Sequence, residues 1–322
     1  STGSILKPFL YAGLINEGTI TPKMLIEDVP IVLSGYAPKN YNEKFDGAVP
    51  AERALSRSLN VPIVKMLKDY GVQKFHNQLN KMGMTTINRP STDYGLSLIL
   101  GGAEAKLWDL CGVYGNMGVI LNQYASGNEF QPAGFSFVQN QSVKSQFKYH
   151  IQPAAVWETF NAMLAVSRPD DDVNWQAFET SQKIAWKTGT SFGFRDAWAI
   201  GVSRKYVVGV WVGNADGEGR PGLVGVKAAA PLLFDVFDRL PKSDWFELPY
   251  DNMALAEICR QSGHRASSIC ETRDTTLIPS TALRSTICPY HQTVFFDPTG
   301  KYRVHSDCEL VHNMTTATRL VL

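Results

Sequence analysis

The stretch KIAWKTGTSFGFRDAWAIGVSRKYVVGVWVG, from Lys183 to Gly213, decides the fold. It predicts three strands, at about 183–190, 196–202 and 206–213, because apolar and β-branched residues fill these segments and turn residues separate them. Ser203-Arg204-Lys205 read as a hairpin turn. Strands joined by such short turns pair antiparallel, so this stretch predicts an antiparallel hairpin within a sheet.

The chain before this stretch carries helical patterns. Apolar residues recur at helical spacing, several segments begin near a proline, and glycines follow their ends. We expect helices over about 5–17, 51–57, 61–70, 72–82 and 103–117, another that begins at Pro153, and a last one over 227–240. Helices that lie between an early helix and a late hairpin predict an α+β fold, in which a sheet domain carries a helical subdomain.

Length and charge limit the classes of function. The chain has 322 residues, an apolar fraction of 44% and a net charge of +1, which predict a large core and two domains. No basic stripe alternates with aromatic residues, so we expect no nucleic-acid partner. No apolar run reaches the roughly 18 residues of a membrane helix, and no signal peptide opens the chain. Both ends read as cut, so we expect a fragment of a longer protein.

The cysteines are unevenly distributed along the chain. Cys111 lies alone in an amphipathic helix, which predicts a buried apolar side chain. Four others gather near the C-terminus and favour disulfides in an oxidising compartment, with one zinc site or free thiols as the alternatives. Cys288-Pro289-Tyr290-His291 offers a Cys-x-x-His spacing, and the sequence does not choose among the three possible disulfide pairings. The four candidates are Cys259, Cys270, Cys288 and Cys308.

Three short motifs carry the predicted chemistry: Ser4-Ile5-Leu6-Lys7, Ser58-Leu59-Asn60 and Lys187-Thr188-Gly189-Thr190-Ser191. A serine three residues before a lysine on a helix places hydroxyl and amine on one face, as a nucleophile with its base. Each motif alone is weak, because Ser145-Gln146-Phe147-Lys148 and Ser126-Gly127-Asn128 repeat the first two patterns. The order helix, loop, strand gives the set its weight.

The lysines and the loop residues suit a proton-transfer site. Lys7 acts as a base only if burial and a second cation lower its pKa, and Lys187 can be that cation. Ser58 can relay a proton between Lys7 and a leaving amine. Asn60 offers an amide that holds a substrate carbonyl and can also bond Lys7. The predicted catalytic residues are therefore Ser4, Lys7, Ser58, Asn60 and Lys187.

The third motif suits an extended peptide with a terminal carboxylate. Its strand can pair with such a peptide, and the hydroxyls of Thr188 and Thr190 can bind the carboxylate together with Lys187. The backbone N–H groups of Ser4 and Thr190 are natural oxyanion donors. The predicted substrate-binding residues are Thr188, Gly189, Thr190 and Ser191.

These motifs resemble those of the penicillin-binding transpeptidases. Thr2–Pro8 and Ala54–Pro62 look like the class A, bifunctional form, and Lys187–Trp198 is similar to its 1C-like subtype. The resemblance predicts a penicillin-binding, serine β-lactamase-like transpeptidase fold over 1–246, without its N-terminal strands. The sheet would then expose an edge, and the isolated fragment would be unstable or inactive. Residues 247–322 look like an incomplete, cysteine-containing, mostly β C-terminal domain.

The resemblance also implies an activity and a location. Such enzymes cross-link peptidoglycan by attacking the D-Ala-D-Ala bond of a stem peptide, and β-lactams acylate the same serine, here Ser4. It implies no cofactor and no metal in the catalytic site. It places the enzyme on the periplasmic side of the bacterial inner membrane, held by an anchor upstream of this chain, where a glycosyltransferase domain is also expected.

Three other readings of the motifs stay open. A D,D-carboxypeptidase would use water in place of the acceptor amine. A non-catalytic β-lactam sensor or scaffold would bind without turnover. A serine β-lactamase is disfavoured, because no Glu-x-x-x-Asn loop that could hold a deacylating water lies between the second and third motifs.

Overall fold

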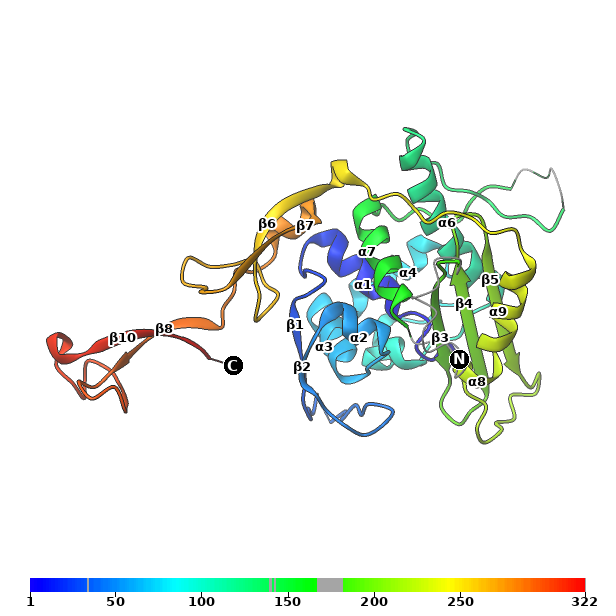
Figure 1. Ribbon diagram of the computed structural model, residues 1–322. Helices are drawn as coiled ribbons and strands as arrows, with labels where there is room; N and C mark the ends of the chain where they lie inside the picture. The colour runs from blue at the N-terminus through cyan, green and yellow to red at the C-terminus, as the bar shows by residue number, and fades with distance from the viewer. Residues whose placement is uncertain (34, 139–140, 142, 167–181, 322) are drawn as a thin grey trace.

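The structure, a computed structural model, describes residues 1–33, 35–138, 141, 143–166 and 182–321. Figure 1 shows a cluster of helices with a sheet on one side and an elongated tail that extends from the other side. None of the helices among the described residues combines the length and the hydropathy needed to span a membrane.

The predicted sheet is present. Strands β3 (Ala185–Thr190), β4 (Asp196–Val202) and β5 (Val207–Gly213) pair antiparallel in the order β3-β4-β5. Within the described residues β3 and β5 are therefore the two edges of this sheet. β4 is buried along almost its whole length, because helices cover both of its faces. The Lys187–Thr190 segment of the third motif therefore lies on an edge strand of this sheet.

Two layers of helices enclose this sheet. Helices α8 (Gly225–Ala228) and α9 (Ala230–Arg239) cover one face (Figure 1). The sequence predicts one helix over 227–240, and the structure breaks it at Ala229. Pro231 supplies no N–H, and its ring clashes with a continuous helix one turn before it. Contacts from α6 (Leu107–Ala125) and α7 (Pro153–Leu164) cover the other face.

The remaining helices form the cluster behind the sheet. Helix α1 (Lys7–Glu17) runs through its centre and is fully buried over its first two turns, which explains why Phe9 and Leu10 are inaccessible to solvent. The helices around it are α2 (Ala51–Ser56), α3 (Val61–Tyr70), α4 (Val72–Met82), α5 (Ser91–Tyr94) and the 3₁₀ helix η1 (Gly95–Leu100).

One hairpin is absent from the sequence prediction. The segment 19–48 reads as loop, because prolines and glycines interrupt it. The structure pairs β1 (Leu25–Asp28) with β2 (Gly47–Pro50) antiparallel across this segment. Each strand has only four residues, too few for a recognisable alternation. The hairpin leads directly into α2 and so determines the direction in which the chain enters the loop of the second motif, Ser58–Asn60.

The C-terminal part is mostly β, as predicted, and contains two small sheets. The first pairs β6 (Met253–Cys259) with β7 (Arg273–Pro279), and the second has the order β10-β8-β9. Their strands are β8 (His291–Phe296), β9 (Arg303–Val304) and β10 (Thr315–Leu320), and three 3₁₀ turns accompany them: η3 (Tyr250–Asn252), η4 (Ser280–Arg284) and η5 (Val311–Asn313). The predicted boundary between 246 and 247 stays a prediction.

The cysteines fall into a buried group and single residues outside it. All five are free thiols in the structure. Cys259, Cys270 and Cys288 are buried together, whereas Cys308 is exposed and bonds only within its own turn. Three of the four candidate cysteines thus share one buried place and the fourth lies outside it, and the expectation of disulfides among them stays a prediction.

Candidate active site

Ser4 lies in a turn that packs beside strand β3. The turn is held by the N–H of Ile5 on the carbonyl of Thr2 (3.2 Å) and the N–H of Lys7 on the carbonyl of Ser4 (3.3 Å). Helix α1 begins at Lys7, two residues later than predicted. The Ile5 side chain is fully buried, and the hydroxyl of Tyr114 donates to the Ile5 carbonyl (2.9 Å). The core therefore fixes the backbone of Ser4, while its side chain stays partly accessible.

Two glycines let this turn press against β3. A Cβ at Gly3, where φ is +52°, would lie 2.4 Å from the carbonyl oxygen of Thr190. A Cβ at Gly189 would lie 2.4 Å from the carbonyl oxygen of Thr2. Atoms at such distances overlap, so each glycine is needed for the approach of the other segment. The first and third motifs thus lie side by side.

The Lys7 amine connects the first motif to the second. Lys7 is fully buried, and its Nζ donates to the carbonyls of Ser58 (2.7 Å) and Leu59 (3.1 Å) and to Oδ1 of Asn60 (2.7 Å). It also lies 3.4 Å from Oγ of Ser58. Among the described residues these partners all belong to the loop between α2 and α3. The loop holds the amine one helical turn beyond Ser4.

The Lys187 amine reaches the same serine from the sheet. Lys187 is 1% exposed, and its Nζ lies 2.8 Å from Oγ of Ser58 and 2.8 Å from the carbonyl of Thr188. Ser58 Oγ is therefore placed between two lysine amines from elements far apart in sequence. Such a hydroxyl can pass a proton from one nitrogen toward a bound group.

Burial tunes both amines toward neutrality. It lowers the pKa of Lys7 well below its usual value, and the neighbouring Lys187 charge lowers it further. Burial also lowers the pKa of Lys187 to about 7. Two cations buried in one site oppose each other's ionisation, so Lys7 holds its proton less strongly than an exposed lysine does. This is the condition that the sequence required of a lysine base.

Ser58 occupies a strained turn. Its φ is +55°, in the left-handed region where a residue with a Cβ is uncommon. Such a backbone costs about 1–3 kcal/mol and persists only where the surroundings enforce it. Here the N–H of Leu59 bonds the Ala54 carbonyl at 3.0 Å, and Lys7 Nζ accounts for the carbonyls of Ser58 and Leu59. The strain directs the Ser58 hydroxyl toward the lysines.

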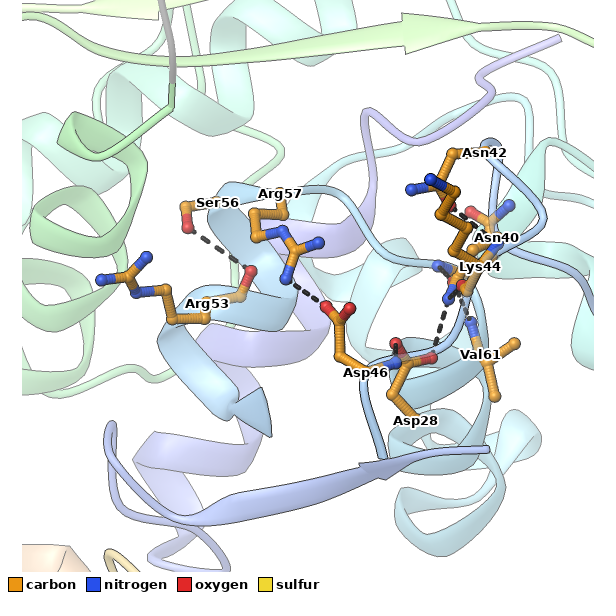
Figure 2. A network of polar contacts seen from close by, with 10 residues as sticks. Asp28, Asn40, Asn42, Lys44, Asp46, Arg53, Ser56, Arg57 and Val61 are labelled. Carbon is orange, nitrogen blue, oxygen red and sulfur yellow. Dashed lines mark hydrogen bonds and ion pairs between the residues drawn. The ribbon is translucent and has the colours of Figure 1, made fainter. Parts of the chain in front are cut away.

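A network of polar residues holds the end of the second motif, where α3 begins (Figure 2). Oδ1 of Asn40 accepts the backbone N–H groups of Asn60 (2.9 Å) and Val61 (3.2 Å), at the start of α3. The amide of Asn40 donates to Oδ1 of Asp28 (2.7 Å), and Asp28 also accepts the N–H of Asp46 (3.1 Å). Asp28 and Asn40 are buried. Sequence reasoning missed both, because Asn40 lies twenty residues before the helix start that it caps and no local pattern links the two.

The predicted substrate-binding residues of the third motif lie in two kinds of surroundings. Thr188 and Thr190 are partly accessible on the edge strand, next to Ser4, and Thr190 Oγ1 accepts the N–H of Gly225 (2.9 Å). Ser191, predicted as a substrate contact, is buried, and its Oγ accepts the N–H groups of Arg195 (3.2 Å) and Asp196 (2.7 Å). Its hydroxyl closes the β3–β4 turn, and its contact with substrate stays a prediction.

Comparison with known proteins identifies related sequences. A family model described as "Penicillin binding protein transpeptidase domain" matches residues 1–231. Penicillin-binding protein 1C of Escherichia coli (strain K12) is 36% identical over 236 residues, which are 73% of this chain and 29% of that protein. Penicillin-binding protein 1A of Neisseria cinerea is 28% identical over 251 residues, 72% of this chain and 30% of that protein. The chain thus spans less than a third of the length of these curated relatives.

Solved structures share the fold. Penicillin-Binding Protein 1A from Haemophilus influenzae superposes with a TM-score of 0.64 at 18% identity, over 87% of this chain and 48% of that chain. The PonA1 protein from Mycobacterium tuberculosis in complex with penicillin V gives a TM-score of 0.59 at 18% identity, over 76% and 71% of the two chains. The predicted α+β transpeptidase fold is confirmed.

Proposed function

Since this chain belongs to the penicillin-binding protein transpeptidase family, we propose that it is a serine acyl-transferase that cross-links peptidoglycan stem peptides. Its donor substrate would be a stem peptide that ends in D-Ala-D-Ala, and β-lactams would acylate the same serine, Ser4. The observation that carries this proposal is the convergence of two buried lysines on Ser58, next to the turn that holds Ser4.

The proposed acylation uses all three motifs. The donor peptide pairs with the free edge of β3, and its terminal carboxylate is held by Lys187 and the hydroxyls of Thr188 and Thr190. Neutral Lys7 takes the proton of Ser4 as Oγ attacks the penultimate carbonyl. The backbone N–H groups of Ser4 and Thr190 would stabilise the oxyanion.

Collapse of this intermediate needs a proton on the leaving amine. Lys7 is within 3.4 Å of Ser58 Oγ, so the proton it received can pass through that hydroxyl to the departing D-alanine. An acyl ester on Ser4 remains. An acceptor amine then attacks the ester, and the same relay returns a proton to Ser4 as the new peptide bond forms.

The first experiment locates the nucleophile. Labelling of the folded chain with a fluorescent penicillin is expected to give one covalent band, which Ser4→Ala abolishes while the circular dichroism spectrum stays unchanged. Ser145→Ala is the matched control, because it alters the second Ser-x-x-Lys pattern, and the Ser145 hydroxyl accepts the N–H of Phe147 (3.1 Å). Labelling that survives in Ser4→Ala would refute the assignment.

Product analysis separates the neighbouring functions. A D-Ala-D-Ala stem peptide is incubated with the chain, with and without an added acceptor amine. A transpeptidase forms the amide with the amine, a D,D-carboxypeptidase releases D-alanine by hydrolysis alone, and a sensor gives neither product. We expect the first result and a location on the periplasmic side of the inner membrane, since the relatives act on peptidoglycan.

A further inference from the structure

Four side chains that the catalytic site does not use gather in the C-terminal part. They are Cys259, at the end of β6, Cys270, before β7, and Cys288 with His291, at the start of β8. Their exposed fractions are 0%, 3%, 5% and 6%, so water reaches none of them freely. The one potential ligand atom of each lies within 4.8 Å of the other three. Thiol and imidazole groups rarely gather in this way without a shared partner.

The distances match a tetrahedral ion. Nδ1 of His291 lies 3.6 Å from the sulfur of Cys259 and 3.4 Å from those of Cys270 and Cys288. Zinc–sulfur bonds of about 2.3 Å and a zinc–nitrogen bond of about 2.05 Å, at a tetrahedral angle, place sulfur and nitrogen about 3.6 Å apart. The three nitrogen–sulfur distances therefore fit a zinc ion, and all four atoms lie within 4.8 Å of one another.

Hydrogen bonding alone does not explain this arrangement. A neutral imidazole nitrogen has one lone pair or one proton, so it makes one good hydrogen bond. Three sulfurs surround Nδ1 of His291. One disulfide among the three cysteines would leave the third thiol buried without a pair. A single cation that accepts all four ligands satisfies every one of them.

Groups around the cluster fix its ligands. Oε1 of Gln261 accepts from Nε2 of His291 (2.8 Å), which places the proton on Nε2 and leaves the Nδ1 lone pair facing the sulfurs. Oγ of Ser262 donates to the sulfur of Cys288 (3.1 Å), and the N–H of Ser267 donates to that of Cys270 (3.3 Å). Donors to sulfur stabilise thiolates, and a partner on the second ring nitrogen is typical of metal-bound histidine.

We propose that Cys259, Cys270, Cys288 and His291 bind one zinc ion in a closed, structural site. Three thiolates and one imidazole complete the tetrahedron, so no position remains for water or substrate. The local apolar core is small, since the buried cluster beside it contains only Ile258, Ile278 and Ala282 among the described residues. Small β units with so little core depend on a metal or a disulfide for stability.

The site also bears on the transpeptidase domain. The turn between Cys259 and His264 docks there: the Thr21 hydroxyl donates to the Gly263 carbonyl (2.6 Å), and the Leu25 N–H donates to the Ser262 carbonyl (2.9 Å). Leu25 begins β1, whose last residue, Asp28, holds the Asn40 network (Figure 2). The ion therefore fixes the turn on which the β1–β2 hairpin rests.

Metal analysis of the purified full chain tests the proposal. The reduced chain is stripped of metal with a chelator and then dialysed against zinc. It is expected to retain one equivalent of zinc, as measured by inductively coupled plasma mass spectrometry. Cobalt added to the stripped chain should give the strong visible absorption of a tetrahedral thiolate site. Cys288→Ser and His291→Ala should lose both signals, whereas Cys308→Ser and His305→Gln, which change exposed residues outside the cluster, should keep them.

Two further readouts make the result decisive. Gln261→Ala keeps all four ligands and should lower zinc affinity by about 10–100-fold, as removal of such a supporting group does. The stripped wild-type chain is titrated first, so a variant that fails to fold cannot decide the outcome. A stripped and reduced wild-type chain that takes up neither zinc nor cobalt would overturn the proposal, and so would a disulfide among the three cysteines in the chain as isolated.

Discussion

Replacing Lys187 by methionine is expected to stabilise the protein while it removes activity. The folded protein keeps the Lys187 amine 1% exposed, and burial lowers its pKa to about 7. A lysine in the unfolded chain titrates near about 10.4, and each pKa unit corresponds to about 1.36 kcal/mol. Holding Lys187 charged in the folded state therefore costs roughly 5 kcal/mol, and methionine of similar length removes that cost.

The pH dependence gives this prediction its sign. Below pH 7 Lys187 is protonated in both states, so its full cost is present. As pH rises from about 7 to about 10.4 the folded protein releases the proton and the unfolded chain keeps it, so the wild type gains stability. The stability advantage of Lys187→Met should therefore shrink by roughly 4 kcal/mol between pH 6 and pH 10.

Urea unfolding at a series of pH values measures the effect. The free energy of unfolding of Lys187→Met is compared with the wild type and with Lys183→Met, which replaces an exposed lysine before β3 and should show no such trend. The same variant should acylate with penicillin at least tenfold more slowly at pH 7, because Ser58 loses its contact at 2.8 Å. A difference in stability that stays constant across this pH range would refute the reasoning.

Three further substitutions test the support of the site. Asn40→Ala should lower the free energy of unfolding by about 1–2 kcal/mol and slow penicillin acylation, because it removes the cap of α3. Asn42→Ala, which changes an exposed residue, should alter neither quantity. Urea unfolding and labelling rates measure both. Gly189→Ala should slow acylation at least tenfold, since its Cβ would meet the turn before Ser4. Gly112→Ala in α6 should not, because its Cβ would contact only the Phe135 ring at an ordinary 3.8 Å; quenched labelling reactions compare the two variants. Ser58→Gly should raise the melting temperature, because it relieves about 1 kcal/mol of backbone strain, and it should abolish transfer to an amine. A melting temperature below that of Ser58→Ala would contradict the assigned strain.

Local rules predicted much of the helical part and the sheet. The bounds of α3, α4 and β4 match the sequence to the residue, because Pro62, Gly71 and Gly83 mark the helix ends and turn residues flank the strand. The break at Ala229 was missed, because an amphipathic stripe continues on both sides of it and Pro231 was read as an early helix position.

The long-range features were less accessible. The β1–β2 hairpin has short strands with no alternation, and Asn40 caps a helix that begins twenty residues later, at Asn60 and Val61. No local sequence pattern predicts the pairing of β1 with β2 or the hydrogen bonds of Asn40 to the start of α3. Cys288 and His291 carried a readable spacing, but Cys259 and Cys270 join them through long and unequal intervals that only folding brings together.

The account stands on Lys7 as the neutral base that activates Ser4. Its most direct test is the rate of penicillin acylation against pH, with the acylated peptide identified by tandem mass spectrometry. The penicilloyl group should lie on Ser4, and the rate should rise as Lys7 loses its proton at a pH well below the ordinary pKa of lysine, an increase that Lys7→Met removes. An adduct on any other residue, or an unchanged rate in Lys7→Met, would contradict it.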